Sequence, residues 1–201
     1  MVYIILRVFV TCYLRLFHSL KIIGAENIPA DGPVILCANH SSFFDSMLVG
    51  LCTKRHVRFI VYYTYYSHWL LGPFIKAFKA IPITQKGTDK EAMKKALNVL
   101  KNGGVISIFP EGRMTLTGLP GPAKPGMALL SALSNAQIVP ITIIGAFYVY
   151  PRWRKLPMSK GKIMVKVHPP VKLDPDRRHE KGYLQGVTNQ VMGIIERGIV
   201  P

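Results

Sequence analysis

Apolar runs separated by turn-rich segments divide most of the chain into alternating strands and helices. Short runs rich in Val, Ile and Phe predict buried strands, and apolar residues that recur every three or four positions predict helices. Strands are expected at residues 34–39, 57–62, 80–84, 105–109, 138–144 and 163–167, and helices at 44–53, 88–101, 125–134 and 183–197, with a broken helix at 66–79. This alternation predicts a single α/β domain over residues 23–201, with a largely parallel or mixed sheet flanked by helices.

The helix expected at residues 88–101 has the clearest boundaries. Thr88 and Glu91 match a capping box, and Gly103 supplies the stop. The strand that follows it leads into a Gly-, Pro- and Thr-rich loop at residues 111–124. Polar residues at the start of that loop therefore lie just beyond the end of a buried strand.

The first 22 residues form a separate apolar segment with a helical pattern. Its polar residues Arg7, Thr11, Arg15 and His18 are spaced four, four and three apart, so on a helix they form one narrow stripe. We predict an amphipathic helix over residues 1–22 that lies in or dips into a bilayer, with its arginines on lipid phosphates. A helix that packs on the core is the alternative.

Composition narrows the partners that such a domain can have. The chain of 201 residues carries 26 Lys and Arg against 10 Asp and Glu, a formal net charge of +16, while 49% of its residues are hydrophobic. Positive charge favours nucleic acid, an anionic membrane or phosphorylated substrates, and the added apolarity favours the membrane. Three cysteines, an odd number, argue against a disulfide framework and fit a reducing compartment. We expect a protein associated with the cytoplasmic face of a membrane.

The first candidate for chemistry is a His and an Asp that are five residues apart, in the stretch CANHSSFFDS. His40 follows a predicted strand, and Asp45 falls in the first turn of the next helix. Functional residues of parallel α/β sheets gather beyond the carboxyl ends of the strands. The spacing lets the carboxylate reach one imidazole nitrogen while the other faces a substrate. This is two thirds of a Ser-His-Asp triad, and it suits a substrate that brings its own hydroxyl.

A second candidate cluster follows another predicted strand, in the stretch FPEGRMTLTG. It contains Glu111, Gly112 and Arg113. Glycine permits close approach of the backbone, and arginine presents a fork of donors that suits phosphate oxygens. A plain turn is the alternative reading of the same residues.

The stretches NHSSFFD and FPEGRMT together resemble the paired signatures of the glycerolipid acyltransferases, the lysophosphatidic acid acyltransferase family. Further matches follow in the family's order. GAENIPADGPVILCANH resembles its opening segment, FIKAFKAIPI its second block, and IVPITI its fourth. The resemblance extends over residues 23–144.

This resemblance implies acyl transfer from acyl-CoA or acyl-carrier protein to the free hydroxyl of a lysophospholipid, with no metal and no cofactor beyond that co-substrate. It makes His40 the general base and Asp45 its orienting partner, while Glu111, Gly112 and Arg113 shape the acceptor site. The expected acceptor is 1-acyl-sn-glycerol-3-phosphate, which gives phosphatidic acid in phospholipid biosynthesis. Backbone N–H groups at a helix start are the expected donors to the thioester oxyanion.

Two positions depart from the family pattern. The second block usually ends in an Arg that binds the acceptor phosphate, whereas here Gln85 aligns with it and Lys86 comes next. The third block more often reads Glu-Gly-Thr-Arg-Ser, and EGRMTLTG is closer to the acyltransferase half of the bifunctional 2-acylglycerophosphoethanolamine acyltransferases. A 2-acylglycerophosphoethanolamine acceptor, in phospholipid remodelling, is therefore the alternative.

Two rival functions come from other classes. Cys37, His40, Cys52 and His56 have a spacing that resembles a zinc site, but the intervening residues are apolar. The basic and aromatic residues of segment 148–155, with the net charge, suggest a nucleic-acid-binding protein. Its cations are spread over many elements and no nucleic-acid motif is present, so we expect no nucleic-acid partner.

Overall fold

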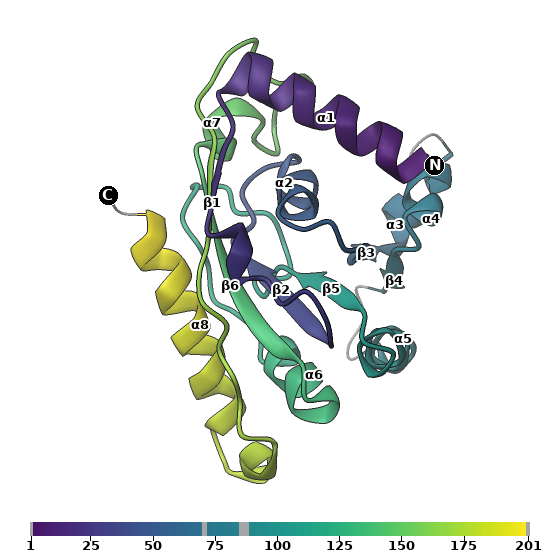
Figure 1. Ribbon diagram of the computed structural model, residues 1–201, viewed down its shortest axis with the longest axis vertical. Coiled ribbons are helices and arrows are strands. Elements are labelled where there is room, and N and C mark those ends of the chain that lie inside the picture. The colour runs from purple at the N-terminus through teal and green to yellow at the C-terminus, as the bar shows by residue number, and fades with distance from the viewer. Residues whose placement is uncertain (1, 70–71, 85–88, 200–201) are drawn as a thin grey trace.

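The structure is a computed structural model of the 201-residue chain, and it describes residues 2–69, 72–84 and 89–199, apart from the side chains of residues 2–7 and 74. Within these residues a seven-stranded mixed sheet forms the centre of the molecule (Figure 1). Its spatial order is β1-β7-β6-β2-β5-β3-β4, with every neighbouring pair parallel except β6 and β7. The strands are β1 Lys21–Ile23, β2 Val34–Ala38, β3 Val57–Tyr62, β4 Ile81–Ile83, β5 Val105–Ile108, β6 Gln137–Ile144 and β7 Met164–Val167.

Helices cover both faces of this sheet, so the domain has three layers (Figure 1). One face is covered by α1, α2 and α7, and the other by α5, α6 and α8. The α-helices are α1 Val2–His18, α2 Asp45–Leu51, α3 Tyr63–Tyr66, α4 Gly72–Ala77, α5 Lys90–Lys101, α6 Gly126–Ser134, α7 Ala146–Val149 and α8 Tyr183–Ile199, with 3-10 turns η1 Ala25–Asn27 and η2 Pro175–His179. The α/β class and the largely parallel or mixed sheet are confirmed.

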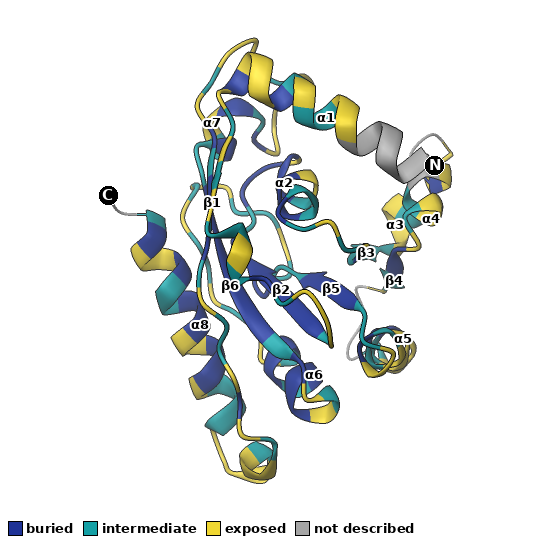
Figure 2. Cartoon of the chain, in the orientation of Figure 1, coloured by how far each residue is buried: buried dark blue, intermediate teal, exposed yellow. Residues whose placement is uncertain are grey.

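The central strand β2 shows why the sheet is buried on both sides. All five of its residues are apolar and buried. Val34 and Leu36 pack into the core beneath α1 and α2, whereas Ile35 and Cys37 pack against α5, α6 and α8 on the other face. A continuous apolar run is what a strand covered by helices on both faces requires. The buried colouring of the inner strands in Figure 2 follows from this pattern.

The positions of β2 and β5 determine where the site forms. These strands are parallel neighbours, and Cys37 is in register with Ile108. Their carboxyl ends therefore lie at the same edge of the sheet. His40 and Glu111 each come three residues after that registered pair, so the two predicted clusters leave the sheet side by side.

The N-terminal helix α1 packs on the domain through part of its polar stripe. His18 is fully buried, and so is Leu14, one turn earlier. The ring of His18 contacts those of Tyr13 and Phe44, whereas Arg15 of the same stripe is exposed. The exposed face is otherwise largely apolar and includes Phe9, which is 68% exposed, and Leu16, which is 78% exposed. The side chain of Arg7 lies outside the described residues.

The boundary of α1 also differs from the expected one. The helix ends at His18, because Ser19 adopts a positive φ of 44° and strand β1 then begins at Lys21. Across the described ranges, no helix is both long enough and apolar enough to cross a bilayer. The bilayer role of the helix and the division of the chain at residue 22 stay predictions.

Smaller departures concern short elements and one helix cap. Strand β1 and helix α7 are three and four residues long and were not expected. The cap of α5 is Asp89, whose side chain accepts a hydrogen bond from the N–H of Ala92. The predicted cap, Thr88, lies outside the described residues, and Glu91 belongs to the first turn of the helix. Within the broken helix expected at residues 66–79, α4 is present, whereas α3 overlaps the expected range only at Tyr66.

Candidate active site

The structure brings His40 and Asp45 into direct contact at the end of β2. Nδ1 of His40 lies 2.9 Å from Oδ2 of Asp45. Asp45 is fully buried, and the same oxygen accepts hydrogen bonds from the backbone N–H groups of Ser41 and Ser42, at 2.6 and 2.7 Å. A carboxylate in this position keeps the proton on Nδ1, which leaves the lone pair of Nε2 free to accept one. The predicted contact between the two side chains is therefore present.

The other side of the imidazole is positioned by an aromatic ring. The His40 ring stacks on Phe109 with 4.1 Å between centroids and an angle of 17° between planes. The His40 side chain keeps 20% of its surface exposed. Among the described residues, no protein group forms a hydrogen bond with Nε2. The imidazole is thus fixed by a carboxylate at one nitrogen and a ring on one face, with Nε2 available to a substrate.

Glu111 holds together the two segments that follow β2 and β5. Its Oε1 accepts the backbone N–H of His40 at 2.9 Å, and its Oε2 accepts the backbone N–H of Gly121 at 3.0 Å. The carboxylate is buried, and that burial raises its pKa above the ordinary range for glutamate although the two hydrogen bonds oppose the rise. Glu111 was expected to shape the acceptor site, and its contacts make it a residue that positions His40.

Gly112 and Arg113 begin the loop that leaves β5. Gly112 has a φ of +71°, a conformation that side chains disfavour, and its carbonyl accepts a hydrogen bond from the hydroxyl of Tyr62. The turn sends Arg113 outward, where its side chain is exposed. The loop then returns to the dyad, because the N–H of Thr115 donates to the carbonyl of His40 at 2.8 Å. Arg113 is therefore exposed two residues before Thr115, whose N–H contacts the backbone of the dyad, and it is free to meet a ligand.

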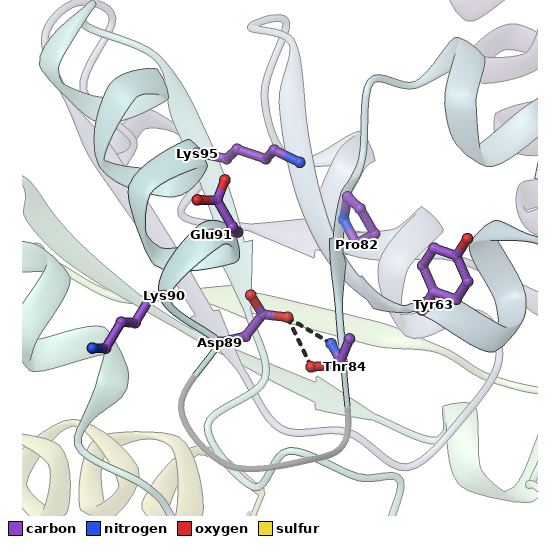
Figure 3. Close-up of a pocket in the computed structure, with 7 residues that line it drawn as sticks. All are labelled: Tyr63, Pro82, Thr84, Asp89, Lys90, Glu91 and Lys95. Carbon is purple, nitrogen blue, oxygen red and sulfur yellow. Dashed lines mark hydrogen bonds between the residues drawn. The ribbon is translucent and has the colours of Figure 1, made fainter.

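The segment that aligns with the end of the family's second block cannot be compared with the dyad. Gln85 and Lys86 fall outside the described residues. A pocket of about 540 Å³ adjoins that segment, between β4 and the start of α5. Figure 3 shows Asp89 in this pocket, where it accepts hydrogen bonds from the N–H and hydroxyl of Thr84 at 2.8 and 3.0 Å. Neither His40 nor Asp45 lines it, so the pocket is distinct from the dyad.

The backbone N–H groups from His40 to Asp45, which lead into α2, are all paired within the protein. The amide of His40 donates to Glu111, and those of Ser41 and Ser42 donate to Asp45. The amide of Phe43 donates to the carbonyl of Tyr150, and the next two donate to the hydroxyl and the carbonyl of Ser42. These six amides are therefore not available to an oxyanion, and the expectation of oxyanion donors at a helix start stays a prediction.

The zinc alternative does not assemble. Cys37 lies within β2, and burial raises the pKa of its thiol, which disfavours the thiolate that zinc binds. In the part of the chain that the structure describes, no group of three His, Cys, Asp or Glu side chains is placed to hold a metal ion.

Several residues that support the dyad were missed in the sequence. Asn39 joins the end of β2 to β6, because its side chain exchanges two hydrogen bonds with the backbone of Ile143, at 3.0 and 2.8 Å. Tyr150 supplies a carbonyl that accepts from Phe43 N and from Ser42 Oγ, at 3.3 and 2.9 Å. These contacts span more than 100 residues of chain, so no local pattern indicates them. Phe109, by contrast, stands at the end of a predicted strand and could have been considered.

The fold and the His–Asp pair correspond to a known class of protein. The chain belongs to the Acyltransferase family, whose model matches residues 19–144, more than half of the sequence. That region contains β1 to β6, His40, Asp45 and the Glu111 loop.

Individual relatives extend this assignment. The chain is 26% identical over 159 residues to the 1-acyl-sn-glycerol-3-phosphate acyltransferase of Bacillus subtilis, covering 79% of this chain and 76% of the relative. It is 26% identical over 158 residues to the chloroplastic 1-acyl-sn-glycerol-3-phosphate acyltransferase LPAT1 of Arabidopsis thaliana, covering 77% of this chain but only 44% of that protein. The match to the corresponding protein BAT2 of Brassica napus likewise spans 46% of the relative.

A solved structure has the same fold. The crystal structure of the 1-acyl-sn-glycerophosphate (LPA) acyltransferase PlsC from Thermotoga maritima matches with a TM-score of 0.73 and 24% sequence identity. The match covers 89% of this chain and 70% of PlsC.

Proposed function

We propose that this protein transfers an acyl group from acyl-CoA or acyl-carrier protein to the free hydroxyl of a lysophospholipid, with 1-acyl-sn-glycerol-3-phosphate as the preferred acceptor. The product is phosphatidic acid, in phospholipid biosynthesis. The observation that carries the proposal is the contact of 2.9 Å between His40 Nδ1 and a fully buried Asp45 carboxylate, with Nε2 left available. Family membership supports the reaction type, and the names of the relatives support the acceptor.

The proposed reaction needs no nucleophile from the protein. Nε2 of His40 removes the proton of the acceptor hydroxyl as the hydroxyl oxygen attacks the thioester carbonyl carbon. The C–O ester bond forms, the C–S bond breaks, and the proton passes from Nε2 to the departing thiolate. Asp45 stays ionised throughout, keeps the imidazole in one tautomer and stabilises the imidazolium that forms.

The acceptor's phosphate is assigned to the loop after β5. Arg113 is an exposed guanidinium that follows the left-handed turn at Gly112, and an arginine fork binds phosphate oxygens in pairs. Lys86 is the second cation proposed for this phosphate. Glu111 acts through the backbone of His40 and does not itself need to touch the acceptor.

The proposed location is the cytoplasmic face of a membrane, where a lysophospholipid acceptor resides. The apolar outer face of α1 supports this location, since Phe9 and Leu16 are exposed there without a protein partner.

The two alternative functions are less well supported. A 2-acylglycerophosphoethanolamine acceptor is not favoured by the relatives' names, and nucleic-acid binding would leave the His40–Asp45 contact without a purpose.

The proposal is tested by incubating purified protein with acyl-CoA or acyl-carrier protein and a panel of lysophospholipids, then identifying the products by mass. His40→Ala should reduce transfer by about 10²- to 10⁴-fold, because it removes the general base. His179→Ala is the matched control, since His179 is exposed in η2. Near-normal transfer by a folded His40→Ala protein would contradict the mechanism.

Asp45→Asn tests the second member of the dyad. Asparagine has nearly the same shape but no charge, so it neither fixes the required tautomer nor stabilises the imidazolium, and kcat should fall by about 10²- to 10⁴-fold. The amide nitrogen would also take the place of the buried Oδ1, which has no hydrogen-bond partner among the described residues, and an unpaired buried NH2 group should lower Tm. Unchanged kcat in the folded variant would show that His40 acts without Asp45.

A further inference from the structure

The segment between α7 and β7, residues 150–162, is unusually basic, and its cations have no part in the reaction proposed above. It contains five Lys or Arg residues and no Asp or Glu. Across the described residues, none of these cations forms an ion pair. We call this segment the 150–162 loop; its cations are Arg152, Arg154, Lys155, Lys160 and Lys162.

The same loop exposes large apolar side chains among its cations. Trp153 is 58% exposed and Leu156 is 76% exposed. Met158 is also exposed, as is Tyr148 at the end of α7. Figure 2 shows the loop beside the C-terminal end of α1, with exposed residues along it. Cations interleaved with exposed Trp, Tyr and Leu are the composition of a surface that meets both phosphates and acyl chains.

The loop is held in shape, so these side chains are displayed by the fold. The N–H of Met158 donates to the carbonyl of Val149 at 2.9 Å, and the hydroxyl of Tyr150 donates to the carbonyl of Lys155 at 3.1 Å. The ring of Trp153 packs edge to face on Phe147 at 5.2 Å, which fixes one side of the indole and leaves the other outward.

Two sets of contacts join the loop to surfaces already described. The N–H of Gly161 donates to the carbonyl of Phe17 at 3.2 Å, so the loop continues the exposed apolar face of α1. At its other end, the carbonyl of Tyr150 accepts from Phe43 N and Ser42 Oγ, within the segment that joins His40 to Asp45. A surface bound to the loop would therefore lie next to the dyad.

We propose that the 150–162 loop is a docking surface for an anionic lipid bilayer. Its cations contact lipid phosphates, while Trp153 and Leu156 enter the boundary between head groups and acyl chains. An acidic protein would also suit the charge and could bury the apolar side chains, but a bilayer covers the loop together with the exposed apolar face of α1 that it continues. Nucleic acid would use aromatic rings for stacking and gains nothing from Leu156 or Met158. This inference goes beyond the proposed acyl transfer, and vesicle binding tests it without turnover.

The test measures co-sedimentation of the full chain with vesicles of phosphatidylcholine containing phosphatidylglycerol. Arg154→Gln with Lys155→Gln should weaken partition about 25-fold, because each cation near an anionic surface contributes roughly fivefold. The matched control is Lys172→Gln with Lys181→Gln, two exposed lysines near η2 at the opposite end of the molecule. The control pair should leave partition within about twofold of wild type.

A second pair of variants tests the apolar part of the loop. Trp153→Ala with Leu156→Ala should weaken partition on vesicles with or without phosphatidylglycerol, whereas Leu133→Ala, an exposed leucine in α6, should not. Unchanged partition in the 150–162 variants, or an equal loss in the lysine control pair, would overturn the proposal. It would also be overturned if these variants lost only binding to an RNA oligonucleotide or to acyl-carrier protein.

Activity separates this proposal from the acyl transfer. The loop variants should keep wild-type transfer to a monomeric, short-chain acceptor, because none of the substituted residues belongs to the dyad. Loss of that activity together with unchanged vesicle partition would contradict the docking surface and leave the reaction itself standing. Loss of vesicle partition with a wild-type rate on the short-chain acceptor would support the surface, whatever the preferred acceptor proves to be.

Discussion

At the scale of single residues, two buried carboxylates share the positioning of His40. Asp45 holds His40 and two backbone N–H groups, and Glu111 holds the backbone of His40 and Gly121. Both carboxylates are therefore required to keep one imidazole in place. A base held at both its ring and its backbone loses little entropy when the acceptor hydroxyl arrives.

Glu111→Gln should make this positioning role visible through pH. Burial raises the pKa of Glu111, so its folded-state contribution to stability is full below the unfolded pKa and is lost as pH rises through the folded pKa. The free energy of unfolding of wild type should therefore decline relative to Glu111→Gln as pH rises above about 4, the ordinary pKa of a glutamate. Glutamine also leaves the N–H of His40 or Gly121 unpaired, which should lower kcat more than it raises KM. Urea unfolding as a function of pH measures the first effect, and a difference that does not vary with pH would contradict it.

The proposed head-group preference would depend on the cations that meet the acceptor phosphate. A phosphomonoester carries more charge than a phosphodiester and gains more from each added cation. Gln85→Arg should therefore raise the preference for lysophosphatidic acid over lysophosphatidylethanolamine, while Arg113→Ala should weaken the use of both, mainly through KM. The measurement is the ratio of kcat/KM for the two acceptors. If Gln85→Arg leaves the ratio unchanged, residue 85 does not face the head group.

The sequence predicted the local part of the site and not its long-range part. His40 and Asp45 are five residues apart across a strand end and a helix start, so ordinary geometry brings them together. The contact of Glu111 with His40 depends on β2 and β5 being neighbours, and one sequence without a structure does not give the strand order. The Tyr150 carbonyl and the Asn39 side chain were missed for the same reason.

At the scale of elements, length decided which parts of the fold were predictable. Every strand expected from an apolar run is present, because a buried strand needs such a run on both faces. Strand β1 was missed because it is three residues long and pairs only with β7 at the edge of the sheet. Helix α7 is a single turn within an aromatic segment, which gives no helical period. Its Gly145 cap has a positive φ, the one local sign of a turn there.

The cap of α5 gives a prediction at this scale. Asp89 accepts hydrogen bonds from Ala92 N and from Thr84, so it starts the helix and ties it to β4. Asp89→Ala should lower Tm by about 2–4 °C, and Asp89→Asn, which can still cap the helix, by less. These hydrogen bonds lower the pKa of Asp89, so its contribution is present above the unfolded pKa and is lost as pH falls through the folded one. Thermal melts should show the difference between wild type and Asp89→Ala disappear in acid.

At the scale of the whole molecule, α1, α2 and α7 cover one face of the sheet, so the apolar face of α1 and the dyad-bearing segment share a side (Figure 1). Phe9→Gln with Leu16→Gln should weaken vesicle binding by at least about tenfold, because each removes an exposed apolar side chain that a bilayer would bury. Activity should fall more on a bilayer acceptor than on a monomeric short-chain one. Equal losses on both acceptors would mean that the helix serves only the fold.

A buried residue of the same helix is a control for the exposed pair, because it should affect stability. Leu14 is fully buried between α1 and the sheet, so Leu14→Ala should cost about 2–5 kcal/mol of unfolding free energy. The exposed pair should leave that free energy nearly unchanged. Urea unfolding of the two variants separates packing of the helix on the domain from its contact with lipid.

Because β2 and β5 are in parallel register, the chain that connects them can change in length without moving His40 away from Glu111. His40 and Glu111 meet because each comes three residues after a registered pair, Cys37 and Ile108. His40 and Glu111 are 71 positions apart along the chain, and the connection between them includes β3, α3, α4, β4 and α5, none of which sets that meeting. Insertions and deletions in those connections can therefore be absorbed without moving the base. A single residue gained or lost between either strand end and its polar residue would uncouple them while the sheet itself still formed.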